Sequence, residues 1–184
     1  MKKKNSSFKN IHVNFPSILA SICEKNRLDQ LIHLSAMGLE DATDSNYAQS
    51  KLQGEKKIKE IFNKTTILRP SVVYSVDDNF TTTFMTILNR LPVFPIYYEG
   101  KTKFMPIHCS DLTDVIMKVI EKRIYSEIIE CGGPEIISFK EILISLSNLI
   151  DKKRIILPVP LFVGSILAKF MEVSNGVPVV LPEG

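Results

Sequence analysis

Two residues four positions apart, Tyr47 and Lys51, have the clearest potential for chemistry in this 184-residue chain. On a helix they would share one face and could reach the same ligand. A tyrosine hydroxyl is a poor acid or base at neutral pH, because its ordinary pKa is about 10. A neighbouring ammonium favours the phenolate, so Lys51 would lower that pKa and allow proton transfer by Tyr47. Such pairs are also common on solvated helix faces, which is the alternative interpretation.

Ser35 adds a third polar group to this candidate site. It follows an apolar run, residues 30–34, that is typical of a short strand. If that strand ends beside the start of the Tyr47 helix, the Ser35 hydroxyl could hold a substrate carbonyl next to the phenol. Gly54 continues the helix face of Tyr47 and Lys51, and its missing side chain would let another backbone or a ligand approach closely.

The elements that must position these residues alternate between helix-like and strand-like patterns, which indicates an α/β architecture. We predict strands at residues 30–34, 65–69, 127–130 and 154–157, and helices at residues 16–25, 46–62, 79–90, 110–122, 138–149 and 161–173. Residues 91–105 contain two prolines, a glycine and several aromatic residues, so we expect irregular or hairpin structure there. In a doubly wound sheet, ligands bind beyond the carboxyl ends of the strands.

Polar residues mark the starts of three of these helices. Asp77 and Asp78 can cap the helix that follows them, and Ser110 is the predicted cap of the next one. Ser138 and Glu141 have the spacing of a capping box. We therefore expect a helix to begin at each of these signals.

Charge and composition exclude several classes of function. The net charge is +3 and the dense basic run is Lys2–Lys4, without a basic stripe along a face, so no nucleic-acid partner is expected. Three separated cysteines (Cys23, Cys109 and Cys131) form no C-x-x-C pair, which argues against a disulfide scaffold or a zinc site. No apolar stretch approaches the roughly 20 residues that span a bilayer. We expect a cytoplasmic protein without a transmembrane span.

The histidines have simpler structural explanations than catalysis. His33 lies within an apolar run and is expected to be a core histidine. His108 has no third ligand at a metal-binding spacing, so no metal site is expected, and His12 has no partner in view. The apolar segment at residues 161–173 could lie against a membrane or a partner subunit, although folding back onto the domain is favoured.

The candidate residues lie within five sequence blocks that follow one another in the same order as in the atypical short-chain dehydrogenase/reductases. The blocks are LIHLSAMG, YAQSKLQGEKKI, TTILRPSVVYSVDDNF, FMPIHCSDLTDVI and IIECGGPEIISFKEIL. The chain resembles this family of NAD-dependent epimerase/dehydratase-like proteins. Within the family it is most similar to the branch with the NADPH-binding accessory subunit of respiratory complex I and its bacterial relatives. The resemblance extends from Val13 to about Val173.

The resemblance implies a role for each matched position. Tyr47 would be the catalytic phenol, and Lys51 would bind the ribose hydroxyls of a nicotinamide nucleotide, NADP or NAD, while lowering the pKa of the phenol. Ser35 would orient the substrate. Three further residues would line the nicotinamide pocket, namely Pro70, Ser71 and Val73.

The resemblance also implies an architecture, a partial Rossmann-like doubly wound parallel sheet with a small carboxyl-terminal cap subdomain. We predict a polar basic tail at residues 1–10, the carboxyl-terminal part of an NAD(P)-binding domain at 11–131 with an irregular insertion at 91–105, and a substrate or cap region at 132–184. The family begins with a strand and a G-x-x-G-x-x-G turn that holds the pyrophosphate. The first glycine here is Gly38, so we expect the amino-terminal part of the fold to be missing.

This departure from the family leaves three interpretations. The chain could be a truncated NAD(P)-binding oxidoreductase with little activity of its own, which is the reading we favour. It could be one part of a split protein whose amino-terminal half is encoded separately. It could also be a non-catalytic scaffold or assembly protein that contacts complex I-like subunits, peripherally at the inner face of the cytoplasmic membrane. In each case the strand at residues 30–34 would expose an apolar edge, and such edges recruit partners or aggregate.

Overall fold

The computed structural model describes residues 8–159, which form two compact units. Within this range, residues 8–71 and 107–132 make up the first unit, and residues 72–106 and 133–159 make up the second. Most of the predicted basic tail and all of the predicted helix at 161–173 lie outside the described residues. The domain boundaries inferred from the sequence stay predictions.

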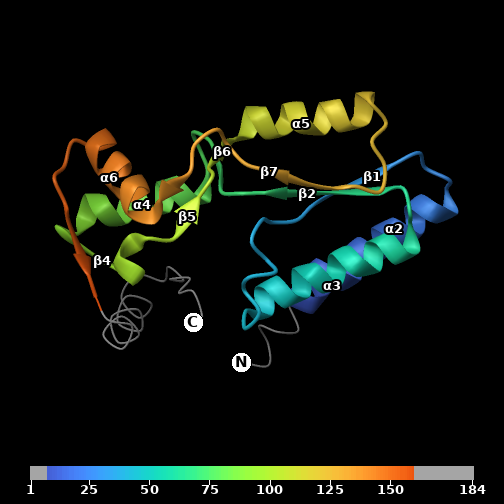
Figure 1. The fold of residues 1–184 in the computed structure, drawn as a ribbon, viewed down its shortest axis with the longest axis horizontal. Helices are drawn as coiled ribbons and strands as arrows, with labels where there is room; N and C mark the ends of the chain where they lie inside the picture. The colour runs from blue at the N-terminus through green and yellow to red at the C-terminus, as the bar shows by residue number, and fades with distance from the viewer. Residues whose placement is uncertain (1–7, 160–184) are drawn as a thin grey trace. The chain divides into compact units, whose positions relative to one another are not determined.

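The first unit is a parallel sheet between helices. Helices α2 and α3 cover one face of the sheet and α5 covers the other, as Figure 1 shows. The strand order is β1-β2-β7, and both neighbouring pairs are parallel. In chain order the elements are η1 (Asn10–Asn14), α2 (Phe15–Lys25), β1 (Leu31–Leu34), α3 (Asn46–Ile61), β2 (Thr65–Pro70), β6 (Ile107–His108), α5 (Cys109–Glu121) and β7 (Ile128–Cys131). The predicted α/β class with a parallel, Rossmann-like sheet is confirmed.

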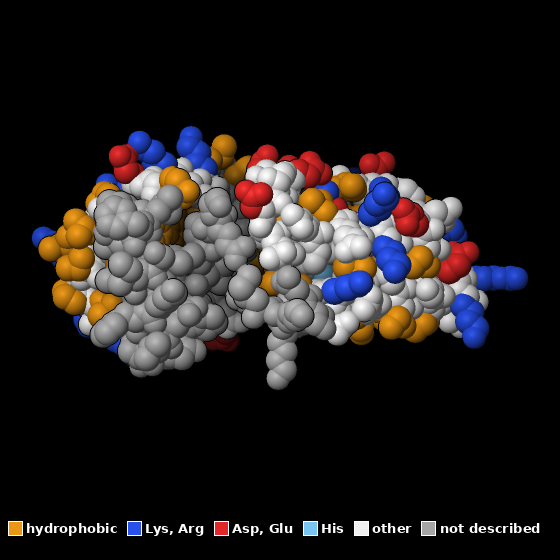
Figure 2. All heavy atoms as spheres, turned by 90° about the horizontal axis from the view of Figure 1, so that it is seen from below, with side chains coloured by type: hydrophobic (Ala, Val, Ile, Leu, Met, Phe, Trp, Pro, Cys, Tyr) orange, Lys and Arg blue, Asp and Glu red, His pale blue; other side chains and the backbone are white. Residues whose placement is uncertain are grey.

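The central strand β2 organises this unit. All of its residues are buried, as expected for a parallel strand covered on both faces. Ile67 of β2 belongs to one apolar cluster with Ala20 and Cys23 of α2 and with Ile58 of α3. On the outer side of α2 and α3, hydrophobic side chains lie among Lys and Arg side chains, in the right half of Figure 2.

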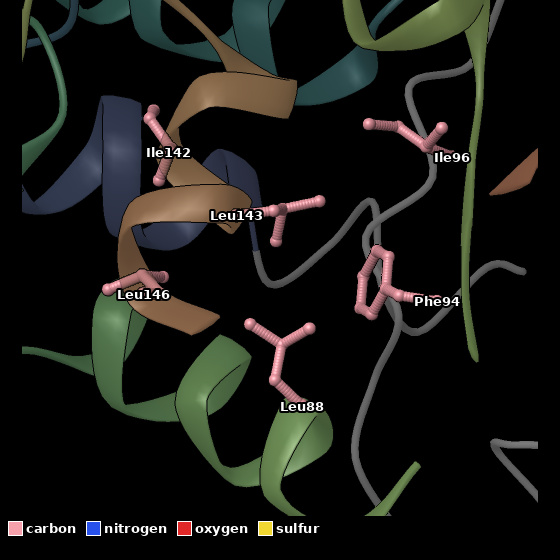
Figure 3. Close-up of a cluster of buried hydrophobic side chains, with 6 residues drawn as sticks. All are labelled: Leu88, Phe94, Ile96, Ile142, Leu143 and Leu146. Carbon is pink, nitrogen blue, oxygen red and sulfur yellow. The ribbon is translucent and has the colours of Figure 1, made fainter. Parts of the chain in front are cut away.

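The second unit combines helices with two short strand pairs. Its elements are β3 (Val73–Tyr74), α4 (Asn79–Arg90), β4 (Val93–Ile96), η2 (Tyr98–Gly100), β5 (Lys103–Phe104), β8 (Ile137–Ser138), α6 (Phe139–Leu149) and β9 (Ile155–Pro158). Figure 3 shows its core, in which side chains from α4, β4 and α6 point toward one another. Leu88 and Leu143 are fully buried in this cluster, and Phe94 and Ile96 supply its strand side. Apolar packing between α4 and α6 thus holds the unit together.

Two of the three predicted helix starts are confirmed by cap geometry. The Asp78 carboxylate accepts a hydrogen bond from the backbone N–H of Thr81 at 2.6 Å and caps α4. Ser138 and Glu141 form the predicted capping box of α6. These short-range hydrogen bonds are the features that a local sequence pattern can predict.

The predicted cap at Ser110 is wrong. Helix α5 begins one residue earlier, at Cys109, and its cap is His108. The ring nitrogen Nδ1 of His108 accepts from the backbone N–H of Ser110 at 3.3 Å. Cap preferences favour Ser, Thr, Asp and Asn, so they do not anticipate an imidazole in this position.

The hairpin that was one expectation for residues 91–105 does not form, although much of this stretch is irregular between its short strands. Strand β4 pairs in parallel with β9, and β5 pairs antiparallel with β8. Neither strand pairs with its neighbour in sequence, so no hairpin forms. Phe94 and Ile96 lie on the same face of β4 and both point into the core. The strand that pairs with β4 comes much later in the chain.

Candidate functional site

Tyr47 and Lys51 lie on one face of the first turns of α3. Ser45 caps this helix, its side-chain oxygen accepting from the backbone N–H of Ala48 at 3.3 Å. The ammonium nitrogen of Lys51 lies over the Tyr47 ring, 5.6 Å from its centroid. The phenol side chain remains 41% exposed. The helix therefore presents the phenol and the ammonium together to a potential ligand.

Burial shifts the ionisation of both residues of this pair. Burial raises the pKa of Tyr47, and burial lowers the pKa of Lys51 while the Glu55 carboxylate opposes that change. The net direction for Tyr47 is thus upward, and the lowering of the phenol's pKa by Lys51 stays a prediction. The ammonium lies over the aromatic ring, and burial disfavours the charged phenolate. The Tyr47 phenol is thus protonated at neutral pH.

His12 joins this pair from the π-helical segment η1. Its Nδ1 lies 2.8 Å from the Ser50 hydroxyl oxygen, and its ring meets the Tyr47 ring edge-on with 5.1 Å between centroids. The Ser50 hydroxyl donates to the Tyr47 carbonyl at 2.8 Å, so Nδ1 of His12 is the donor to Ser50. Burial and the Lys51 ammonium lower the pKa of His12. The expectation that His12 has no partner is wrong, because its partners follow far along the sequence.

Gly54 allows η1 to press against α3. A Cβ atom at this position would lie 1.9 Å from the backbone oxygen of His12. No side chain can be accommodated at that distance, so the close approach requires glycine. The prediction that Gly54 admits another backbone is confirmed, and the backbone is that of His12.

The carboxyl ends of the strands carry the remaining candidates. The Ser35 backbone N–H donates to Leu68 at 2.7 Å, while the Ser35 hydroxyl oxygen is buried and has no hydrogen-bond partner among the described residues. Pro70 ends β2, and the Ser71 N–H donates to the carbonyl of Cys131 at 2.9 Å. Because the strands are parallel, these residues share one edge of the sheet.

Val73 belongs to β3 in the second unit, so the structure does not place it with the other candidate residues. Its role in the nicotinamide pocket stays a prediction. The roles of the other residues are proposals that rest on their geometry.

Arg69 is the residue of this site that the sequence did not reveal. Its guanidinium donates to both carboxylate oxygens of Glu55, at 3.2 and 2.8 Å, and to Glu40 at 3.0 Å. The hydrogen bonds to Glu55 raise the pKa of Arg69. The Arg69–Glu55 ion pair joins β2 to α3 one helical turn beyond Lys51. The sequence contained one signal of this ion pair. Arg69 is the charged residue of the buried strand β2, and Glu55 follows Lys51 by four residues.

Metal binding and membrane spanning were two further possibilities for the described part of the chain. Between residues 8 and 159, no three His, Cys, Asp or Glu side chains gather into a metal-binding group. Over the same range, no helix combines the length and the apolar character that crossing a bilayer requires.

Comparison with known proteins identifies the family. The pattern of the RmlD substrate binding domain matches residues 3–134. The chain belongs to this family. The match covers the β1-β2-β7 sheet and the helix with Tyr47 and Lys51, so the resemblance to short-chain dehydrogenase/reductases inferred from the sequence is confirmed for this RmlD-type chain.

The relatives of the RmlD-type chain include a respiratory-complex subunit and sugar-nucleotide enzymes. NADH dehydrogenase [ubiquinone] 1 alpha subcomplex subunit 9, mitochondrial, from Dictyostelium discoideum is 30% identical over 76% of this chain and 39% of that protein. A dTDP-4-dehydrorhamnose reductase from Clostridium acetobutylicum has a TM-score of 0.75 at 19% identity, over 85% of this chain and 59% of that one. The Bacillus anthracis reductase in complex with NADP has a TM-score of 0.72 at 20% identity, over 85% and 60%.

The chain matches only part of each of these proteins. The RmlD-type chain spans well under half of the Dictyostelium protein and about three fifths of each reductase. The structural likeness establishes the shared fold.

Proposed function

We propose that this chain carries the nicotinamide end of an NAD(P)-linked oxidoreductase site of the short-chain dehydrogenase/reductase type. The arrangement of Tyr47 and Lys51 on one helix face supports this proposal most directly. The buried Ser35 hydroxyl supplies independent support, because it follows a strand of the same unit and finds no partner among the described residues. A buried hydroxyl without a partner is unfavourable unless another group binds it.

The ionisation states suit the reduction of a carbonyl group. Burial keeps Tyr47 protonated, so its hydroxyl can donate a proton to the substrate oxygen. The Lys51 ammonium would then offset the charge on the phenolate and donate hydrogen bonds to ribose hydroxyls. The Ser35 hydroxyl would donate to the same substrate oxygen and orient it. A bound nicotinamide nucleotide, NADP or NAD, would supply the hydride.

The described residues suit the nicotinamide and ribose better than the pyrophosphate. Pro70 and Ser71, which end and follow β2, would line the nicotinamide pocket. The first glycine in the chain is Gly38, so the residues before β1 contain no glycine-rich turn. Such a turn normally holds the pyrophosphate at a helix start. We therefore infer that the phosphate groups require contacts from outside the described residues.

Thermal unfolding with nicotinamide mononucleotide and with NADPH tests this proposal. A ligand that binds only the folded chain raises its stability, by about 1 kcal/mol at five times its Kd. We expect both nucleotides to raise Tm at millimolar concentration, with a similar effect because they share the nicotinamide and ribose. Lys51→Met should remove the rise, whereas the matched variant Lys56→Met, at an exposed position on the same helix, should retain it. Equal responses of the two variants would contradict a role for Lys51.

An alternative proposal is that the chain acts without catalysis, as a scaffold beside complex I-like subunits. The relative from Dictyostelium, named as a subunit of NADH dehydrogenase, favours it. This role would place the chain peripherally on a membrane, attached through its partners. It keeps the nucleotide site but does not require proton transfer by Tyr47.

Tyr47→Phe separates the two proposals, because it removes the proton donor and keeps the ring. Blue native electrophoresis can follow complex I assembly in a Dictyostelium strain that lacks its own subunit and expresses this chain or the variant. Equal assembly with both chains supports the scaffold. If neither chain restores assembly, the scaffold proposal is rejected.

A further inference from the structure

A short chain of hydrogen bonds fixes His12 beside Tyr47. The Nδ1 of His12 donates to the Ser50 hydroxyl oxygen at 2.8 Å, and that hydroxyl donates to the Tyr47 carbonyl at 2.8 Å. Because the Ser50 proton is used in the second bond, Nδ1 of His12 carries the proton of the first. The bonds therefore join η1 to α3 at the residue that carries the phenol.

Ring contacts place the same imidazole against the Tyr47 side chain. The His12 and Tyr47 rings are nearly perpendicular, at 87°, with 5.1 Å between their centroids. Phe8 stacks on His12 at 5.4 Å and meets Tyr47 edge-on at 6.0 Å. Edge-to-face and stacked pairs at such distances are favourable arrangements of aromatic rings. Phe8 and His12 thus hold the phenol ring, while the Lys51 ammonium lies 5.6 Å from its centroid.

The packing of η1 on α3 does not require this imidazole. Gly54 lets the two backbones approach so closely that a Cβ atom there would lie 1.9 Å from the His12 carbonyl oxygen. Val13, the next residue of η1, is buried and supplies apolar packing. The backbone contact and Val13 account for the position of η1, so the His12 side chain is available for another role.

The charge of His12 responds to the groups that face it. Burial and Lys51 of α3 lower the pKa of His12, and His12 in turn helps to lower the pKa of His33 in β1. The His12 ring is therefore neutral near pH 7 and gains a proton in acid. A protonated imidazole donates from both nitrogens, so the bond to Ser50 is compatible with either state. Acid thus adds a positive charge beside the Tyr47 ring without requiring the His12 ring to move.

We propose that His12 is a positioning residue for Tyr47, which orients the phenol beside Lys51 and couples proton donation by Tyr47 to pH. The proposal rests on the proposed function, in which Tyr47 gives its hydroxyl proton to the substrate oxygen and the nicotinamide supplies the hydride. Donation leaves a phenolate on Tyr47. An imidazolium beside that ring favours the phenolate, because a nearby opposite charge stabilises the ionised form. Proton donation by Tyr47 is therefore expected to become easier as His12 gains a proton.

A pH titration followed by NMR tests the coupling, with tyrosine carrying ¹³C at Cζ. The Tyr47 signal is identified by its loss in Tyr47→Phe. Between about pH 8 and 5 this signal should shift with a midpoint below the ordinary histidine pKa of about 6.5, as His12 gains its proton. The titration uses no nucleotide, so it can fail separately from the Lys51→Met test of nucleotide binding.

Two histidine variants assign the shift. His12→Phe should abolish it, because this variant keeps an aromatic ring at the position and removes the titrating group. His33→Asn should retain it, because the imidazole in contact with Tyr47 is that of His12. Circular dichroism establishes that each variant is folded, and His12→Asn takes the place of His12→Phe if the latter does not fold.

A matched pair of serine variants tests the positioning. Ser50 and Ser21 each donate from the hydroxyl to a backbone carbonyl about one turn earlier, at 2.8 and 2.9 Å, but Ser50 also accepts from His12. Ser50→Ala should weaken the nuclear Overhauser effect between the His12 and Tyr47 rings. Ser21→Ala should leave that effect unchanged.

Three results would overturn the proposal. The first is a Tyr47 signal without an inflection in this pH range. The second is an inflection that His33→Asn removes and His12→Phe retains, which would assign the titration to His33. The third is an equal effect of Ser50→Ala and Ser21→Ala on the contact between the two rings.

Discussion

Burial controls the protonation of single residues around Tyr47. It raises the pKa of Tyr47 and lowers the pKa of Lys51, His12 and His33. Each of these side chains is therefore shifted toward its neutral form. Such shifts reduce the cost of covering these groups with a ligand, because covering a charged group has a large desolvation cost.

His12 and His33 are expected to make folding stability depend on pH. Both have a pKa below the ordinary 6.5 in the folded chain, mainly through burial. As the pH falls through about 6.5, the unfolded chain binds more protons at these rings than the folded chain does, so the free energy of unfolding decreases. Urea denaturation between about pH 7.5 and 5.5 measures this slope. The double variant His12→Asn, His33→Asn should have a smaller slope, and an unchanged slope would contradict the assignment.

Arg69 offers a comparison of two carboxylates that bind the same guanidinium. The Glu55 side chain is 5% exposed and the Glu40 side chain is 70% exposed. Glu55→Gln should lower the free energy of unfolding by about 3–5 kcal/mol, because it leaves a buried charge uncompensated. Glu40→Gln should cost less than about 1 kcal/mol, since water screens that pair. Chemical denaturation of both variants compares the two losses in the free energy of unfolding. Equal losses would show that Glu55 is not the main anchor of α3.

At the scale of elements, the contact between η1 and α3 depends on one glycine. Gly→Ala within a helix usually stabilises it by about 1 kcal/mol. At Gly54 the added Cβ would lie 1.9 Å from the His12 carbonyl oxygen, so we expect Gly54→Ala to destabilise the chain by about 1–3 kcal/mol. Gln53→Ala, at an exposed neighbouring position, is the control and should be neutral or stabilising. Urea denaturation gives the sign, and a stabilised Gly54→Ala chain would show that η1 does not press on α3.

Elements whose signals are local were predictable from the sequence. Asp78 at the start of α4 and the capping box of α6 act within one helical turn, and β2 opens with two threonines and an isoleucine, which favour strands. Long-range contacts were not predictable. The partner of His12 lies 38 residues away, and the β4–β9 pair joins distant segments. Those contacts depend on how elements pack, which periodicity and cap preferences do not encode.

At the scale of the whole molecule, the candidate site opens into a pocket between α2 and β1. Lys51 lies over the Tyr47 ring and also lines this pocket beside β1.

The division into two compact units predicts that the second unit loses stability by itself when its core is damaged. Leu143 is fully buried in the cluster of α4, β4 and α6, so Leu143→Ala should lower the free energy of unfolding by about 2–5 kcal/mol. Hydrogen exchange should accelerate in α4 and α6, while the amides of β2 in the first unit keep their protection. Ile144→Ala, at an exposed neighbouring residue, should change neither. Equal acceleration in β2 would instead mean that the chain unfolds as one cooperative unit, in which the Tyr47 site depends on the second core.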